Sequence, residues 1–140
     1  MSEHLVGHLR TGGCQCGAVR YEVNGEPIVV ALCHCTMCRR ANAAPAVAWS
    51  IYSQDQVVFT HAQPKTYQSS SVGQRGFCAE CGTQVCFTAD YIPGLIDLTV
   101  GSFDAPESLL PSLHYWNCRR LPWVSFADKL PRHAEFPSFE

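Results

Sequence analysis

The sequence lacks the clustered positive charge of proteins that bind nucleic acids or anionic membranes. Its 140 residues carry a formal net charge of −2, and no basic run is longer than Arg39-Arg40 or Arg119-Arg120. Binding to a phosphate backbone or to anionic lipid needs a basic patch or stripe. We therefore expect no nucleic-acid partner and no membrane partner.

Targeting and membrane-spanning segments are also absent from the sequence pattern. Residues 1–8 contain no basic region followed by a long apolar stretch, and no later apolar run approaches the roughly 20 residues that span a bilayer. There is no internal repeat and no low-complexity segment. We expect a cytoplasmic protein with a single domain over residues 1–140 and a motif-bearing core at about 12–126. The sequence does not indicate the oligomeric state.

Cysteine is abundant, with nine residues in the chain. In a reducing cytosol thiols stay free unless a metal holds them, so the count favours metal binding over disulfides. The odd number agrees with this interpretation. A disulfide framework remains the alternative, although Cys-x-Cys neighbours are poorly placed to bridge one another.

Seven of the nine cysteines fall into three short groups. The groups are Cys14-Gln15-Cys16, Cys33-His34-Cys35-Thr36-Met37-Cys38 and Cys78-Ala79-Glu80-Cys81. Structural zinc prefers four tetrahedral thiolate ligands, and a Cys-x-x-Cys followed by glycine is typical of a zinc knuckle. Pairing the first group with the third predicts one structural zinc held by four thiolates, Cys14, Cys16, Cys78 and Cys81.

The remaining group supplies only three thiols. Three protein ligands and one open position are typical of a catalytic zinc, which we assign to Cys33, Cys35 and Cys38. The open position could take water or a substrate thiol, and the metal would hold that thiol as a thiolate. Two alternatives stay open: Cys86, Cys118 or a histidine completes a second structural site, or Cys35 and Cys38 form a redox pair. Cys86 is most simply a core thiol.

Several residues near the three-cysteine group, or later in the chain, are candidates for supporting roles. His34 could be a metal ligand, a proton carrier or an exposed spacer, and the spacer is favoured because neighbours in a bend usually point away from a shared metal. Arg39 and Arg40 could bind a substrate carboxylate or form an ordinary solvated face. The stretch His114-Tyr115-Trp116 could line a pocket or simply pack in the core.

Short apolar or alternating segments predict a mainly β protein. We expect a short helix or helical turn from Cys35 to about Asn42, whose first backbone N–H groups point at the sulfurs. Asn24-Gly25 suggests a tight hairpin turn. Strands are predicted at 18–23, 28–33, 46–52, 56–59, 64–68, 83–88, 95–100, 114–116 and 123–126.

The cysteine groups, taken with their neighbours and two later motifs, resemble a known family. The resemblance rests on Gly13-Cys14-x-Cys16-Gly17-Ala18-Val19-Arg20-Tyr21, Cys33-His34-Cys35-x-x-Cys38-Arg39, Phe77-Cys78-x-x-Cys81-Gly82-Thr83, Val100-Gly101-Ser102-Phe103-Asp104 and Pro122-Trp123. Together they are similar to the glutathione-dependent formaldehyde-activating enzymes, a family that includes the centromere protein V type domain. The resemblance runs from about Gly12 to about Trp123.

The resemblance implies a β-tent fold of short antiparallel strands in stacked sheets with two zinc ions per chain. It implies the same division of ligands between a structural and a catalytic zinc. It also implies a carbon–sulfur lyase whose substrates are glutathione, or a similar thiol, and an aldehyde such as formaldehyde, with S-(hydroxymethyl)glutathione as the product. The competing hypotheses are a non-catalytic zinc-binding interaction module and a thiol-dependent enzyme with another substrate, for example one that cleaves a carbon–halogen bond.

Overall fold

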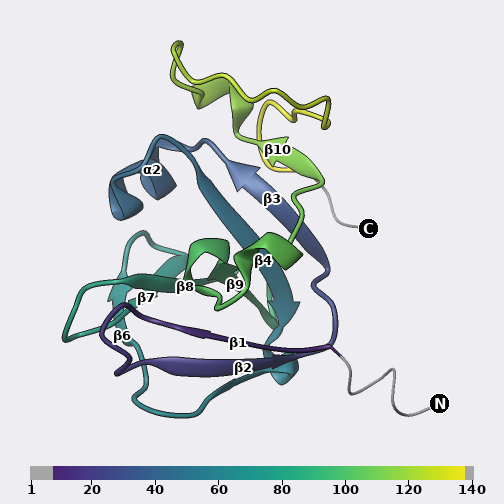
Figure 1. Cartoon of the computed structure of the whole chain (residues 1–140). Helices are drawn as coiled ribbons and strands as arrows, with labels where there is room; N and C mark the ends of the chain where they lie inside the picture. The colour runs from purple at the N-terminus through teal and green to yellow at the C-terminus, as the bar shows by residue number, and fades with distance from the viewer. Residues whose placement is uncertain (1–7, 138–140) are drawn as a thin grey trace.

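A computed structural model describes residues 8–137 and shows a mainly β protein with two sheets (Figure 1). The smaller sheet has the strand order β1-β2-β5, and the larger has the order β10-β3-β4-β9-β8-β7-β6. The strands are β1 Leu9–Gly13, β2 Arg20–Asn24, β3 Val29–Cys33, β4 Val47–Ser53, β5 Val57–Phe59, β6 Lys65–Gln68, β7 Gly73–Phe77, β8 Gln84–Ala89, β9 Leu95–Thr99 and β10 Leu113–Tyr115. Every paired strand is antiparallel to its neighbour except β10, which lies parallel to β3.

The two faces of the larger sheet differ in what they pack against. One face packs towards the smaller sheet, and its core includes the fully buried Tyr52 and Leu98 together with Tyr21 from β2. The other face carries Trp49 and Cys33 in a second cluster of buried residues. Side chains alternate between faces along a strand, so this division follows from the register of β3, β4 and β9.

The helix α2, Thr36–Asn42, begins directly after β3 and ends at Ala43. Cys35 occupies its N-cap, and the sulfur of Cys35 accepts a hydrogen bond from the Cys38 backbone N–H at 3.2 Å. The helix and the amides that point at a sulfur are therefore confirmed. Short 3₁₀ helices lie at Gln54–Gln56, Val100–Ser102, Pro106–Ser108 and Asn117–Arg119.

Two predictions about local structure are wrong. Asn24-Gly25 does not close a hairpin, because β2 and the next strand β3 lie in different sheets. Gly25 has a φ of +86°, and its N–H bonds to the carbonyl of His8, while Gln56 donates to the carbonyl of Asn24. The segment 123–126 is not a strand: it follows a turn in which the Val124 N–H donates to the Leu121 carbonyl.

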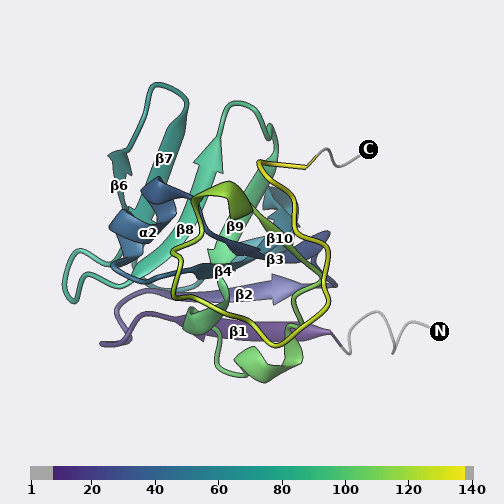
Figure 2. The same ribbon diagram turned by 90° about the horizontal axis from the view of Figure 1, so that it is seen from above.

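The C-terminal segment runs alongside β10 at the end of the molecule opposite β1 and β2 (Figures 1 and 2). Backbone hydrogen bonds join it to β10 and the residues that follow, including the His114 N–H to the Pro131 carbonyl at 2.7 Å and the Trp116 N–H to the Glu135 carbonyl at 3.2 Å. Within residues 8–137, none of the helices has the length and apolar character needed to cross a bilayer.

Candidate metal centres and pocket

Two groups of cysteines in the structure have the geometry to hold a metal ion. The sulfurs of Cys14, Cys16, Cys78 and Cys81 all lie within 4.8 Å of one another, and those of Cys33, Cys35 and Cys38 do so separately. The fold therefore groups the seven thiols as predicted, into a set of four and a set of three.

The set of four joins the turn between β1 and β2 to the turn between β7 and β8. Its Cys14–Cys16 and Cys16–Cys78 sulfur–sulfur distances are 3.6 and 3.8 Å. A tetrahedral zinc with Zn–S bonds of about 2.3 Å requires sulfur–sulfur distances of about 3.8 Å. These two distances therefore match the spacing of thiolates around a tetrahedral zinc.

Hydrogen-bond donors surround the sulfurs of this set. The Cys78 sulfur accepts from the backbone N–H groups of Glu80 and Cys81 at 3.3 and 3.4 Å, in a turn completed by Gly82 at a φ of +82°. The Thr83 hydroxyl lies 3.3 Å from the Cys81 sulfur and is the main cause that lowers the pKa of Cys81 to about 5. Donors of this kind favour thiolates, which are the form that binds metal.

The set of three lies where β3 passes into α2. Cys33 is the last residue of β3, Cys35 caps the helix, and Cys38 lies in its first turn. In the part of the chain that the structure describes, no fourth cysteine, histidine, aspartate or glutamate brings a ligand atom into this group. Cys86, as predicted, is a core thiol, and Cys118 is exposed.

The thiols of this set differ in pKa. Hydrogen bonds from Cys33 and Cys38 lower the pKa of Cys35, whereas hydrogen bonding to Cys35 and Cys38 raises the pKa of Cys33. The first thiolate therefore forms readily and the others resist ionisation, because like charges would lie side by side. A bound dication removes that resistance and favours three thiolates.

A pocket of about 370 Å³ borders the set of three. Its wall is mainly aromatic: the Trp49 and Phe87 rings lie 6.3 Å apart, and the Tyr115 and Phe136 rings 5.1 Å apart. Trp116 also lines it, so two of the three residues predicted as a pocket wall do so. A pocket of this kind excludes most water from a molecule held next to the thiols.

Two buried charged side chains line this largely apolar pocket, and the sequence prediction missed both. Arg75 from β7 and Asp97 from β9 line it and are each only 5% exposed. Arg75 Nη2 donates to the Cys38 sulfur at 3.7 Å, and its guanidinium carbon lies 4.8 Å from the Phe87 ring centroid. Burial raises the pKa of Asp97 to about 7, although Arg75 opposes that shift.

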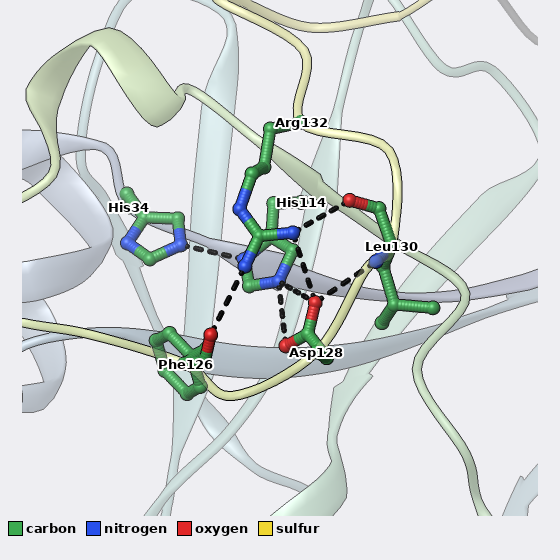
Figure 3. A network of polar contacts seen from close by, with 6 residues as sticks. All are labelled: His34, His114, Phe126, Asp128, Leu130 and Arg132. Atoms are coloured by element: carbon green, nitrogen blue, oxygen red, sulfur yellow. Dashed lines mark hydrogen bonds and ion pairs between the residues drawn. The ribbon is translucent and has the colours of Figure 1, made fainter.

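His34 is fully buried, so the prediction of an exposed spacer is wrong, and its ring is not part of the thiol set. Its Nε2 lies 2.9 Å from Nδ1 of His114, and His114 Nε2 lies 3.2 Å from both carboxylate oxygens of Asp128 (Figure 3). An ionised carboxylate only accepts, so His114 donates from Nε2 and accepts at Nδ1 from His34. His114 therefore serves this buried network and not the pocket wall.

The same network connects the C-terminal segment to the residues between Cys33 and Cys35. Arg132 Nη1 donates to Asp128 at 2.9 Å and to the Leu130 carbonyl at 2.6 Å, and Nη2 donates to the Phe126 carbonyl at 3.3 Å (Figure 3). The Phe126 ring also packs edge-on against the His114 ring at 5.2 Å. Because His34 bonds to His114, these contacts tie the backbone between Cys33 and Cys35 to the C-terminal segment.

The predicted arginine neighbours of the set of three lie outside the pocket. Arg40 lines a different, neighbouring depression, and Arg39 does not line the pocket. The arginines that do line it are Arg75 and Arg119. A role for Arg39 or Arg40 in binding a pocket ligand is therefore not supported by this arrangement.

Comparison with known proteins places these two thiol groups in a family. The family model described as glutathione-dependent formaldehyde-activating enzyme matches residues 9–119, a span that contains all seven clustered cysteines. The chain belongs to this family. The glutathione-dependent formaldehyde-activating enzyme family is also the one that the sequence motifs resemble, so that prediction is confirmed.

Individual relatives agree with the family assignment. The chain is 34% identical over 76 residues to an uncharacterised lyase of Schizosaccharomyces pombe, a match that covers 54% of this chain and 55% of that protein. It is 27% identical over 130 residues to a Halomonas elongata protein with the provisional name of glutathione-dependent formaldehyde-activating enzyme, covering 86% of this chain and 83% of that one. The match to the lyase thus spans about half the length of that relative.

A solved structure supports the fold. A crystal structure of a Rhodobacter sphaeroides protein superposes with a TM-score of 0.56 at 20% sequence identity, covering 87% of this chain and 98% of that one. At this identity the likeness concerns the fold alone. The predicted mainly β architecture of stacked sheets is confirmed, with the parallel pairing of β10 and β3 as an addition.

Proposed function

We propose that this single-domain protein is a zinc-dependent carbon–sulfur lyase that adds a thiol, glutathione or a close analogue, to a small aldehyde such as formaldehyde. The observation that carries the proposal is the set of Cys33, Cys35 and Cys38 beside a pocket lined by several aromatic rings, with no fourth protein ligand among the described residues. A purely structural site would have a fourth ligand, as the set of four does.

The two thiol sets have different roles in this proposal. Cys14, Cys16, Cys78 and Cys81 hold a structural zinc that links the two sheets. Cys33, Cys35 and Cys38 hold the second zinc, which when bound supplies positive charge that favours the thiolate of a substrate thiol. Family membership and the names of the relatives support the thiol and the aldehyde as substrates.

The pocket residues contribute binding and orientation. The rings of Trp49, Phe87 and Tyr115 reduce the access of water and leave room for a small carbonyl compound. Arg75 holds the Cys38 sulfur through Nη2 and so fixes one side of the thiol set. Holding both reactants in one pocket replaces a bimolecular encounter by an oriented one, which accounts for a large part of many enzymatic rate enhancements.

Metal analysis of purified protein tests the division of sites. The wild type should contain two zinc ions per chain, and Cys35→Ser about one with the fold retained, whereas Cys81→Ser should impair folding. An NMR assay with ¹³C-formaldehyde and glutathione then tests the reaction. The wild type should form the hydroxymethyl adduct faster than the spontaneous reaction, and Cys35→Ser should not.

Two results would contradict this proposal. One zinc in the wild type, or unfolding of both variants, would remove the division into structural and functional sites. A wild-type rate equal to the spontaneous rate would remove the formaldehyde reaction.

A further inference from the structure

The pocket contains two buried polar atoms that nothing in the described structure satisfies. Nη1 of Arg75 and Oδ1 of Asp97 have no hydrogen-bond partner within residues 8–137, and both side chains are 5% exposed. Leaving buried polar atoms unpaired carries a large free-energy penalty, so such groups are unusual in folded proteins and are concentrated at functional sites. Both atoms belong to side chains that line the pocket with the three thiols.

The strand register keeps these two side chains apart. Asp97 lies opposite Phe87, and Phe87 lies opposite Arg75, on three neighbouring strands. Two strand spacings separate the two backbones by roughly 10 Å. Arg75 reaches towards Cys38 and stacks over Phe87, so its charge is directed at the thiols and Asp97 is left facing the pocket.

We propose that Asp97 is the residue that carries the proton in the reaction of this pocket, an inference that rests on the function proposed above. The Asp97 carboxylate first takes the proton of the substrate thiol as the thiol binds beside Cys33, Cys35 and Cys38. The thiolate sulfur then forms a bond to the aldehyde carbon, and the carbonyl electron pair moves to oxygen. Asp97 returns the proton to that oxygen, which gives the hydroxymethyl thioether and regenerates the carboxylate.

No other described group in the pocket suits this task. The pocket lining contains no histidine and no second carboxylate. Asp97 interacts electrostatically with four titratable or charged groups, Arg75, Tyr91, Tyr115 and Cys86. The thiols Cys33, Cys35 and Cys38 line the same pocket. Burial raises the pKa of Tyr91 to about 12 and raises that of Tyr115 well above its ordinary value, so both phenols stay protonated at neutral pH.

The protonation behaviour of Asp97 fits the role that its position suggests. Burial raises its pKa to about 7, so the carboxyl group both accepts and donates a proton near neutral pH. General acid–base groups work best when their pKa lies near the working pH.

Proton release on thiol binding tests this role without measuring turnover. Glutathione is titrated at pH 8 into zinc-loaded protein by calorimetry in two buffers of different ionisation enthalpy. Most of the thiol is protonated at this pH, because its pKa is about 8.5, and most of Asp97 is ionised. The bound thiolate disfavours the ionised form of Asp97, so the wild type should keep the proton and release less than about 0.3 per thiol bound, whereas Asp97→Asn should release about 0.75, the protonated fraction of the free thiol at this pH.

Controls and a second measurement make the test decisive. Asp104→Asn, which removes a carboxylate outside this pocket, should behave as the wild type, and so should Asp97→Glu if it keeps the carboxyl group in reach. Infrared difference spectra of the wild type alone should show a carboxylic acid band that grows on thiol binding. That measurement answers the question even if Asp97→Asn does not fold.

Adduct formation supplies the kinetic readout. The kcat/KM of the wild type should rise with pH through about 7, and Asp97→Asn should lack this inflection and be slower by about 10²–10⁴-fold. Equal proton release in the two proteins, no growing acid band, or an unchanged rate in Asp97→Asn would overturn the role of Asp97 and leave the proposed function intact. A wild type that neither binds glutathione nor exceeds the spontaneous rate would overturn both.

Discussion

Replacing Asp97 by asparagine should stabilise the protein at alkaline pH and do so less at acidic pH. The pKa of Asp97 rises from its ordinary 3.8 to about 7 on folding, so the folded state binds this proton more tightly than the unfolded state. Stability from this group is therefore fully present below pH 3.8 and is lost as the pH rises to about 7. The accumulated loss is about 4 kcal/mol at pH 8 and about 2 kcal/mol at pH 5.5.

The assay is urea denaturation of zinc-loaded wild type and Asp97→Asn at pH 5.5 and pH 8. The gain in unfolding free energy from the substitution should be about 2 kcal/mol larger at pH 8 than at pH 5.5. Asp104→Asn is the control of opposite sign. Hydrogen bonds from Arg20 and Thr11 lower the pKa of Asp104 to about 2, so its carboxylate stabilises the folded state and the variant should lose stability at both pH values. A pH-independent effect of Asp97→Asn would refute the reasoning.

Two backbone positions offer matched pairs of variants, to be compared by thermal unfolding. Gly12→Ala should destabilise by about 1–3 kcal/mol, because a Cβ there would lie 2.6 Å from the Ser102 carbonyl oxygen, whereas Gly101→Ala, with nothing within 4 Å, should change little. Ala43→Gly should stabilise by about 1 kcal/mol, because Ala43 ends α2 in the left-handed region at a φ of 50°, whereas Ala41→Gly within α2 should destabilise by a similar amount. Equal effects within either pair would contradict the corresponding argument.

The sequence predicts the thiol sets because the cysteines of each group lie close together in the chain. Two or three cysteines within six residues converge on one ion whatever the rest of the fold does, and only the pairing of Cys14 and Cys16 with Cys78 and Cys81 needs the tertiary structure. Asp97 and Arg75 are different, because their meeting in one pocket depends on the register of three strands. A signal for Asp97 existed: it is a charged residue between apolar neighbours in the strand Leu95–Thr99, whose sequence is LIDLT.

The strands follow the same rule. The predicted bounds of alternating or apolar segments such as 46–52 and 95–100 lie within a residue or two of the observed ends. The spacing of apolar side chains along such a strand shows which of its faces are buried. β1 and β7 were missed, since glycines and polar residues interrupt their patterns. The hairpin at Asn24-Gly25 was wrong because a positive φ permits a bend but does not decide which sheet the next strand joins.

The positions of the two thiol sets in the chain fit the different roles proposed for them. A link between Cys16 and Cys78 closes a loop of 62 residues, and by the chain-entropy relation for covalent cross-links such a closure stabilises by about 4 kcal/mol. Closure of the short loop from Cys33 to Cys38 contributes about 2 kcal/mol by the same relation. Loss of one protein ligand from the second set should therefore cost less stability than loss of one from the set of four, and the second set is the one that borders the pocket.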